Sequence, residues 1–225
     1  MKNFIKAMKM LRYGLQVKTM LILSVAFFMF GLVFEFTLSS IDYNNITSGL
    51  YLAISGVYVY QIMLTSSVSS LVQTSSMKHG LQTIYPAVFT LMTSLFTFTV
   101  FVVIRVVRIN NMGDDFSLPF AKGILSTAFL LGLLLAYMGL CYKQFILSLI
   151  ILCIGVAVIL FTGYAGRMVK MLDFANDLSL GMIVCLGYLI VLAGWILCWL
   201  FSILLYRRPI DFLSVRAALR QASLK

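Results

Sequence analysis

Six long apolar stretches follow one another along the chain, and short polar segments separate them. They cover approximately residues 19–40, 48–72, 84–106, 121–141, 144–164 and 179–205. A helix needs about 20 apolar residues to cross a bilayer, and each stretch is long enough. The pattern predicts an all-α integral membrane bundle of six transmembrane helices, with residues 1–225 forming a single transmembrane domain.

The N-terminal segment has a different pattern, because its apolar residues recur on one narrow side of a helix. The apolar side comprises Phe4, Met8, Leu11 and Leu15. The opposite side comprises Lys2, Lys6 and Lys9. This pattern predicts an interfacial amphipathic helix over residues 1–18, lying along the cytoplasmic membrane surface. A plain basic tail is the alternative.

Composition and length leave little room for anything except the membrane helices. Of the 225 residues, 62% are hydrophobic, against roughly 45–50% in soluble domains. Six spans use about 120 residues, so a soluble catalytic domain of about 100 residues does not fit as well. Any ATPase, kinase or hydrolase that acts with this protein is therefore expected to be another chain.

The formal net charge of +10 indicates orientation. With six spans, both termini lie on one side, and that side holds most of the cations: Lys2, Lys6, Lys9, Arg12, Lys18, Lys78, Lys143, Arg207, Arg208, Arg216, Arg220 and Lys225. The other side holds Arg105, Arg108, Lys122, Arg167 and Lys170. Cations collect on the cytoplasmic side, so both termini and the tail at 206–225 are predicted to be cytoplasmic. No basic domain with interleaved aromatics indicates nucleic-acid binding.

Glycines recur at sevenfold spacing within three of the predicted spans. The pairs are Gly49 with Gly56, Gly132 with Gly139, and Gly187 with Gly194. Each pair lies on one face of its helix, where small residues let helices approach closely. Packing of the bundle is the favoured interpretation, and a ligand path is the alternative.

The residues of known membrane enzymes are missing from the sequence. The only histidine is His79, in a predicted loop. No G-x-S-x-G motif, His cluster or Walker-type glycine loop occurs. The four cysteines are scattered and match no metal or redox pattern. We therefore expect no catalytic residue and no metal site, and no cofactor bound by this chain.

Two charged residues lie close to the ends of predicted spans. Glu35 is near the end of the first span and Arg105 near the end of the third. Both positions fall at a similar depth, which predicts a structural ion pair between them. A carboxylate inside a membrane is also a candidate for a substrate or proton role, which is the alternative.

The segment between the second and third spans is short and polar, from Leu71 to Pro86. Ser75 or Ser76 can cap a short helix, and Pro86 is tolerated in the first turn of the next span. A small helix here would be a handle, meaning a cytoplasmic element that a partner protein binds and through which it moves the adjoining membrane helices. An ordinary tight loop is the alternative.

With this segment the sequence resembles the membrane subunit of type-2 ABC exporters. The resemblance rests on the basic interfacial helix, the six spans, the short helix before the third span and the cytoplasmic C-terminus. The stretch 71–86 is similar to the coupling-helix region of small bacterial permeases that export amphipathic and antimicrobial peptides. The segment from Tyr164 to Asp177 matches a short amphipathic segment that this family has before its last span.

The resemblance implies residues and partners. The coupling helix that contacts the ATPase would comprise Ser75, Ser76, Met77, Lys78, His79 and Leu81. The pathway lining would include Gln61, Thr65, Ser66 and Ser69. Two copies of a separate ATP-binding subunit would carry ATP and Mg, and a second permease copy or a homologous permease would complete the pathway. The expected setting is the bacterial cell membrane, with membrane lipid around the chain and a hydrophobic or amphipathic substrate.

Two other kinds of protein fit the same architecture. One is the ATPase-free, substrate-binding membrane subunit of a vitamin-type importer, which needs a polar pocket near its outer face. The other is a membrane immunity or sensor protein that transports nothing. A membrane enzyme with an unrecognised site is disfavoured because polar clusters are missing from the spans.

Overall fold

The computed structural model describes residues 17–37, 47–66, 78–111, 114–140, 150, 153–155, 157 and 173–207. The principal elements of these residues are six α-helices and one 3-10 helix. They are α2 (Val17–Thr37), α3 (Thr47–Ser66), α5 (Lys78–Gln82), α6 (Ile84–Asn111), α7 (Asp114–Leu140), η1 (Asp173–Asp177) and α10 (Leu180–Leu204).

Four helical stretches of the described chain are long and apolar enough to cross a membrane. They are Val17–Thr37, Lys78–Asn111, Leu118–Gly139 and Leu180–Leu204. A helix satisfies its own backbone hydrogen bonds, which is why apolar runs of this length are helical in a bilayer. The protein is therefore an all-α, multi-pass membrane protein, and four of the predicted spans are confirmed. The second predicted span, 48–72, is helical as α3 from Thr47 to Ser66.

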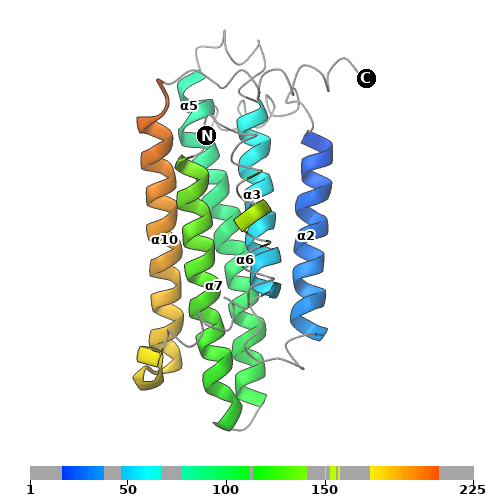
Figure 1. The fold of residues 1–225 in the computed structure, drawn as a ribbon, viewed down its shortest axis with the longest axis vertical. Coiled ribbons are helices and arrows are strands. Elements are labelled where there is room, and N and C mark those ends of the chain that lie inside the picture. Colours follow the sequence, from blue (N-terminus) through cyan, green and yellow to red (C-terminus); the bar gives the residue numbers. More distant parts are fainter. Residues whose placement is uncertain are drawn as a thin grey trace.

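The long helices lie side by side, with α2 at one edge and α10 at the other (Figure 1). Side-chain contacts give their directions. Arg105, near the end of α6, reaches Phe120, near the start of α7. Ala87 of α6 accepts from Trp195 of α10, at 2.7 Å, whereas Thr99 of α6 meets the earlier Tyr188, at 2.9 Å. Helix α6 is thus antiparallel to both α7 and α10, so α7 and α10 run in the same direction.

The outer faces of the bundle are apolar, as a lipid environment requires. Exposed residues on α2 and α10 include Ile22, Phe30, Leu189, Leu200 and Leu204. Helix α2 buries only Ser24, Gly31 and Glu35, which recur at seven- and four-residue intervals on one face. This peripheral helix therefore packs through small and polar residues, and it presents its large apolar residues to lipid.

The glycine pairs lie where helices touch, as their spacing predicts. A Cβ on Gly194 would lie 2.5 Å from Cα and O of Gly132, and one on Gly139 would lie 2.6 Å from Cα of Cys198. Backbone therefore meets backbone along the parallel α7 and α10. On α3, Gly49 faces Thr127 of α7.

Two helices extend past the predicted boundaries of the third and fourth spans. Helix α6 runs to Asn111 instead of ending near 106, and α7 begins at Asp114 instead of 121. Within the stretch 110–117, the described residues 110–111 and 114–117 are helical. The arginines do not end α6, because Arg105 is neutralised inside the bundle by an ion pair.

Several predictions lie wholly or mostly outside the described residues. The interfacial helix is one of them, except that Val17 and Lys18 already belong to α2. The tail at 206–225 is another, apart from Tyr206 and Arg207. Of the predicted span 144–164, only residues 150, 153–155 and 157 are described. The last part of the predicted segment before the final span forms η1.

A buried hydroxyl pair joins α3 to α10 and gives the first testable prediction. The hydroxyls of Tyr60 and Ser202 are 2.9 Å apart, and both residues are buried. Tyr60→Phe should lower the free energy of unfolding by about 1 kcal/mol, the net value of one buried hydrogen bond. The control is Tyr51→Phe, since the contacts of Tyr51 are ring stacking on Phe27 and Phe34. Equal thermal stability of the two variants in detergent would contradict the prediction.

Candidate functional site

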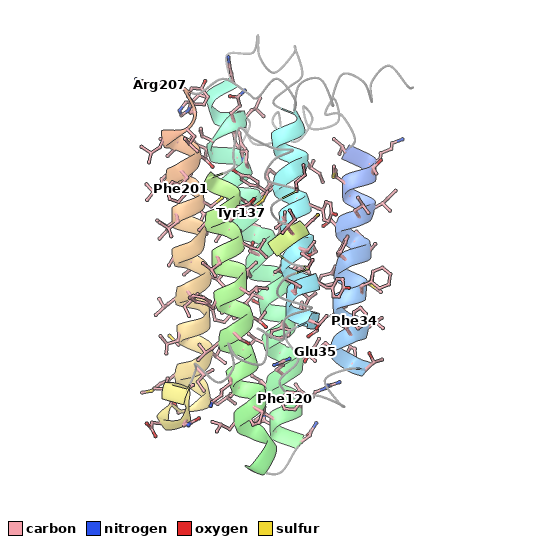
Figure 2. All side chains as sticks on the ribbon, in the orientation of Figure 1. Phe34, Glu35, Phe120, Tyr137, Phe201 and Arg207 are labelled. Atoms are coloured by element: carbon pink, nitrogen blue, oxygen red, sulfur yellow. The ribbon has the colours of Figure 1, made fainter. Side chains whose placement is uncertain are left out.

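The predicted coupling helix lies only partly within the described chain. Lys78, His79 and Leu81 belong to α5, whereas Ser75, Ser76 and Met77 fall outside the described residues. Helix α5 has five residues and lies at the end of the bundle that carries Arg207 (Figure 2), which we name the Arg207 end. The same end holds the start of α2 and the end of α10 (Figure 1).

The structure changes the expected shape of this segment. Helix α5 leads directly into α6, because the two helices together form one helical stretch from Lys78 to Asn111. The amide of Thr83 still donates to the carbonyl of His79, at 3.0 Å, so the helical hydrogen bonding continues across the junction. Pro86 explains the local interruption at Thr83: proline has no amide donor, and its ring crowds the carbonyl four residues earlier.

The three described residues of the coupling segment differ in how far their side chains are exposed. Leu81 is 2% exposed, so its side chain packs inside the bundle and is not available to a partner. His79 is exposed and Lys78 half-buried. The His79 ring meets the ring of Tyr206 edge-on, with 4.8 Å between centroids. A surface for contact would therefore consist of Lys78 and His79, and it adjoins the end of α10.

The proposed pathway lining is described only through its backbone. Gln61, Thr65 and Ser66 belong to the last turns of α3. Ser69 lies outside the described residues.

The predicted ion pair between Glu35 and Arg105 is present. Arg105 Nε donates to Glu35 Oε1 at 2.9 Å, and an Arg105 terminal nitrogen donates to Oε2 at 3.3 Å. Both side chains are 0% exposed. Glu35 lies near the same end of the bundle as Phe120, opposite to Arg207 (Figure 2), and we name this the Glu35 end.

Sequence reasoning missed the neighbours that enclose this pair. The hydroxyl of Ser48 on α3 donates to Glu35 Oε2. Arg105 also donates to the carbonyl of Phe120, at 3.4 Å, and its guanidinium lies over the ring of Phe101, 4.5 Å from the centroid. Residues from α2, α3, α6 and α7 thus meet at one buried cluster, the Arg105 cluster, which comprises Glu35, Ser48, Phe101, Arg105, Phe120 and Gly123.

Gly123 makes room for the guanidinium. A Cβ at this position on α7 would overlap the Arg105 side chain. No sevenfold partner marks Gly123 in the sequence, so spacing alone could not identify it. The Arg105 cluster holds two opposite charges in a fully buried, hydrogen-bonded arrangement, which is the condition under which charges are tolerated within a membrane. Its chemistry is structural: it ties four helices together at one end.

Two other polar residues of the bundle were not anticipated. Ser94 and Thr127 are 0% and 3% exposed, and neither hydroxyl has a hydrogen-bond partner in the described part of the chain. Ser94 and Thr127 belong to the many Ser and Thr residues of the spans. Only the geometry of the bundle distinguishes them.

The described residues contain no group of three or more His, Cys, Asp or Glu side chains that could hold a metal ion. Comparison of the chain with protein-family models, with curated proteins and with solved structures finds no match.

Proposed function

We propose that this chain is the transmembrane permease subunit of an ATP-driven exporter, and that its cargo is an amphipathic peptide. ATP hydrolysis would take place on two separate ATP-binding subunits, and a second permease copy would complete the pathway. The observation that carries the proposal is the helical handle α5 at the Arg207 end, in the segment that resembles a coupling helix. This handle continues into a membrane-spanning helix.

The connection of α5 to the bundle supports a coupling role. Because α5 and α6 form one helical stretch, a displacement of α5 is transmitted to α6. The contact of His79 with Tyr206 also connects α5 to the end of α10. A partner that binds Lys78 and His79 would thereby act on two membrane helices at once.

The state of the buried charges supports an external source of energy. Among the described residues, Glu35 and Arg105 are the charged side chains that are fully buried, and they neutralise each other at 2.9 Å. Carriers driven by protons or sodium use ionisable groups that change state near the middle of the membrane. A carboxylate held by an arginine and a serine is poorly suited to that role.

The directions of the helices support the predicted six-span topology. Helices α7 and α10 run parallel: Gly132 meets Gly194, and Gly139 meets Cys198 further along both helices. The end of α7 and the start of α10 therefore lie at opposite ends of the bundle, as a fifth span over 144–164 would require. The excess of Lys and Arg on the side of the termini supports a cytoplasmic Arg207 end, in a bacterial cell membrane.

Co-purification tests the proposal most directly. The tagged full-length chain, extracted from its native membrane, should carry an ATP-binding chain in a ratio of one to one. Amphipathic peptide should stimulate ATP hydrolysis by the purified complex. Recovery of this chain alone from native lipid, with no ATP-binding chain encoded beside it, would reject the permease function.

A charge reversal on α5 tests the handle. Lys78→Asp combined with His79→Asp should weaken association with the ATP-binding subunit about tenfold, corresponding to about 1.4 kcal/mol of lost contact energy. Thermal stability of the permease should change little, because His79 is exposed, Lys78 is only half-buried, and the double variant loses one ring contact with Tyr206. Asn110→Asp, an exposed site at the Glu35 end, is the control. Unchanged association and transport by the double variant would contradict the assignment.

A further inference from the structure

Two glycines on α3 face two hydroxyl groups on the neighbouring helices. On α7, Thr127 Oγ1 is the atom nearest to the place that a Gly49 Cβ would occupy. On α6, Ser94 Oγ lies 3.5 Å from the corresponding position at Gly56. We name these four residues the α3 seam. Gly49 and Gly56 are two helical turns apart, about 10 Å along one face of α3, so both hydroxyls point at the same strip of bare backbone.

The two hydroxyls differ from their neighbours on the same helices. Thr90 bonds the carbonyl of Pro86 at 2.7 Å, Thr97 that of Ser94 at 3.1 Å, and Ser126 that of Gly123 at 3.1 Å.

Ser94 Oγ and Thr127 Oγ1 instead have no hydrogen-bond partner within the described ranges, although both are buried. An unpaired buried hydroxyl costs about 1–3 kcal/mol, and a bilayer supplies no water to satisfy it. Such groups are expected where another molecule uses them.

The position of the seam in the fold indicates what it separates. Gly49 follows Ser48, which donates to Glu35, so the seam begins beside the Arg105 cluster and extends towards the middle of the bundle. Helices α2 and α3 pack closely on each other, as the contact of Gly31 with Leu52 shows. The seam is therefore the boundary between the α2–α3 pair and the α6–α7 pair.

We propose that the α3 seam is a polar path that takes up water and the uncharged hydrogen-bonding groups of a transported molecule when the α2–α3 pair tilts away from α6 and α7 about the Arg105 cluster, which keeps the four helices joined at the Glu35 end. Ser94 and Thr127 supply hydroxyls that donate and accept, and the glycines leave the backbone of α3 open to contact. The four seam residues carry no charge, which suits peptide amides and hydroxyls. The cargo part of this inference rests on the proposed function.

Cysteine accessibility in the native membrane tests the seam. Ser94→Cys and Thr127→Cys would be made in a chain whose four native cysteines are replaced by alanine. The probe is a small, positively charged, membrane-impermeant methanethiosulfonate. The matched controls are Thr90→Cys and Ser126→Cys, which replace equally buried hydroxyls that bond their own helices. Thiols react as thiolates, so the seam cysteines should react at least about tenfold faster than the controls if water reaches them. Equal rates in all four variants would overturn the proposal.

A stability measurement provides a second test that does not depend on the cysteines. Ser94→Ala should leave Tm unchanged or raise it, because Ser94 Oγ has no hydrogen-bond partner among the described residues and an unpaired buried hydroxyl is costly. A fall in Tm of more than about 3 °C, equivalent to about one hydrogen bond in a protein of this size, would show that Ser94 is paired within the fold and would overturn the seam. Both measurements use the chain in its native membrane and need no ATP-binding subunit. If water does not reach the seam, the co-purification test of the permease function is therefore unaffected. If no ATP-binding subunit is found, the two tests of the seam are likewise unaffected.

Discussion

Arg105→Met should destabilise the protein by about 3–5 kcal/mol, the cost of leaving one partner of a buried ion pair uncompensated. The carboxylate of Glu35 would lose the guanidinium that bonds both of its oxygens, inside a bundle where it is 0% exposed. The substitution would weaken the packing of several helices, because the Arg105 cluster joins four of them. Thermal unfolding in detergent and the yield of monodisperse protein measure the effect.

The matched control removes both charges together. Glu35→Met combined with Arg105→Met should recover most of the stability, because replacing a buried pair by apolar residues of similar volume is often nearly neutral. The double variant would then show that charge, rather than the volume of the arginine, causes the defect. A double variant as unstable as Arg105→Met alone would contradict this explanation.

Gly194→Val should separate α7 from α10 and produce the second large effect. The first atom of any side chain at this position would lie 2.5 Å from the backbone of Gly132. Backbone atoms cannot turn aside as a flexible side chain can, so one helix must shift. Overpacking typically costs about 1–3 kcal/mol, and valine adds two further methyl groups at a point where two backbones touch. The measurement is again Tm, together with the yield of folded protein.

Gly181→Val, on the same helix, is the matched control. A Cβ at Gly181 meets no atom of the described residues within 4 Å beyond its own part of the helix. The same substitution should therefore change Tm little, and any difference between the two variants reports the α7–α10 contact. Equal losses at both positions would indicate that the helix itself, and not its packing, is sensitive to valine.

The environment of the buried charges could be predicted from the sequence only in part. Glu35 and Arg105 were expected to pair because both lie near the ends of apolar runs at a similar depth, and the pair is present at 2.9 Å. Their depth follows from counting residues along helices of known rise. The serine, the glycine and the aromatic rings around them come from three other parts of the chain, and no count along one helix can bring those parts together.

The ends of the helices show a related limit. Arg105 suggested the end of a span, because an isolated charge is costly within a membrane. The ion pair removes that cost, and α6 continues to Asn111. Likewise, Pro86 suggested a fresh start for a helix, whereas the helical stretch begins eight residues earlier, at Lys78. A local signal predicts a break correctly only when no distant contact offsets it.

The sequence by itself determined that the chain is an all-helical, multi-pass membrane protein, because backbone hydrogen bonding and apolar length act locally along each helix. It also determined which glycines lie on one helix face, since that depends only on spacing. The tertiary structure alone decided that Gly123 accommodates Arg105, that α5 is joined to α6, and that Ser94 and Thr127 face bare backbone on α3. These features depend on which helices are neighbours and at what height they meet, and that is set by side-chain packing across the whole bundle.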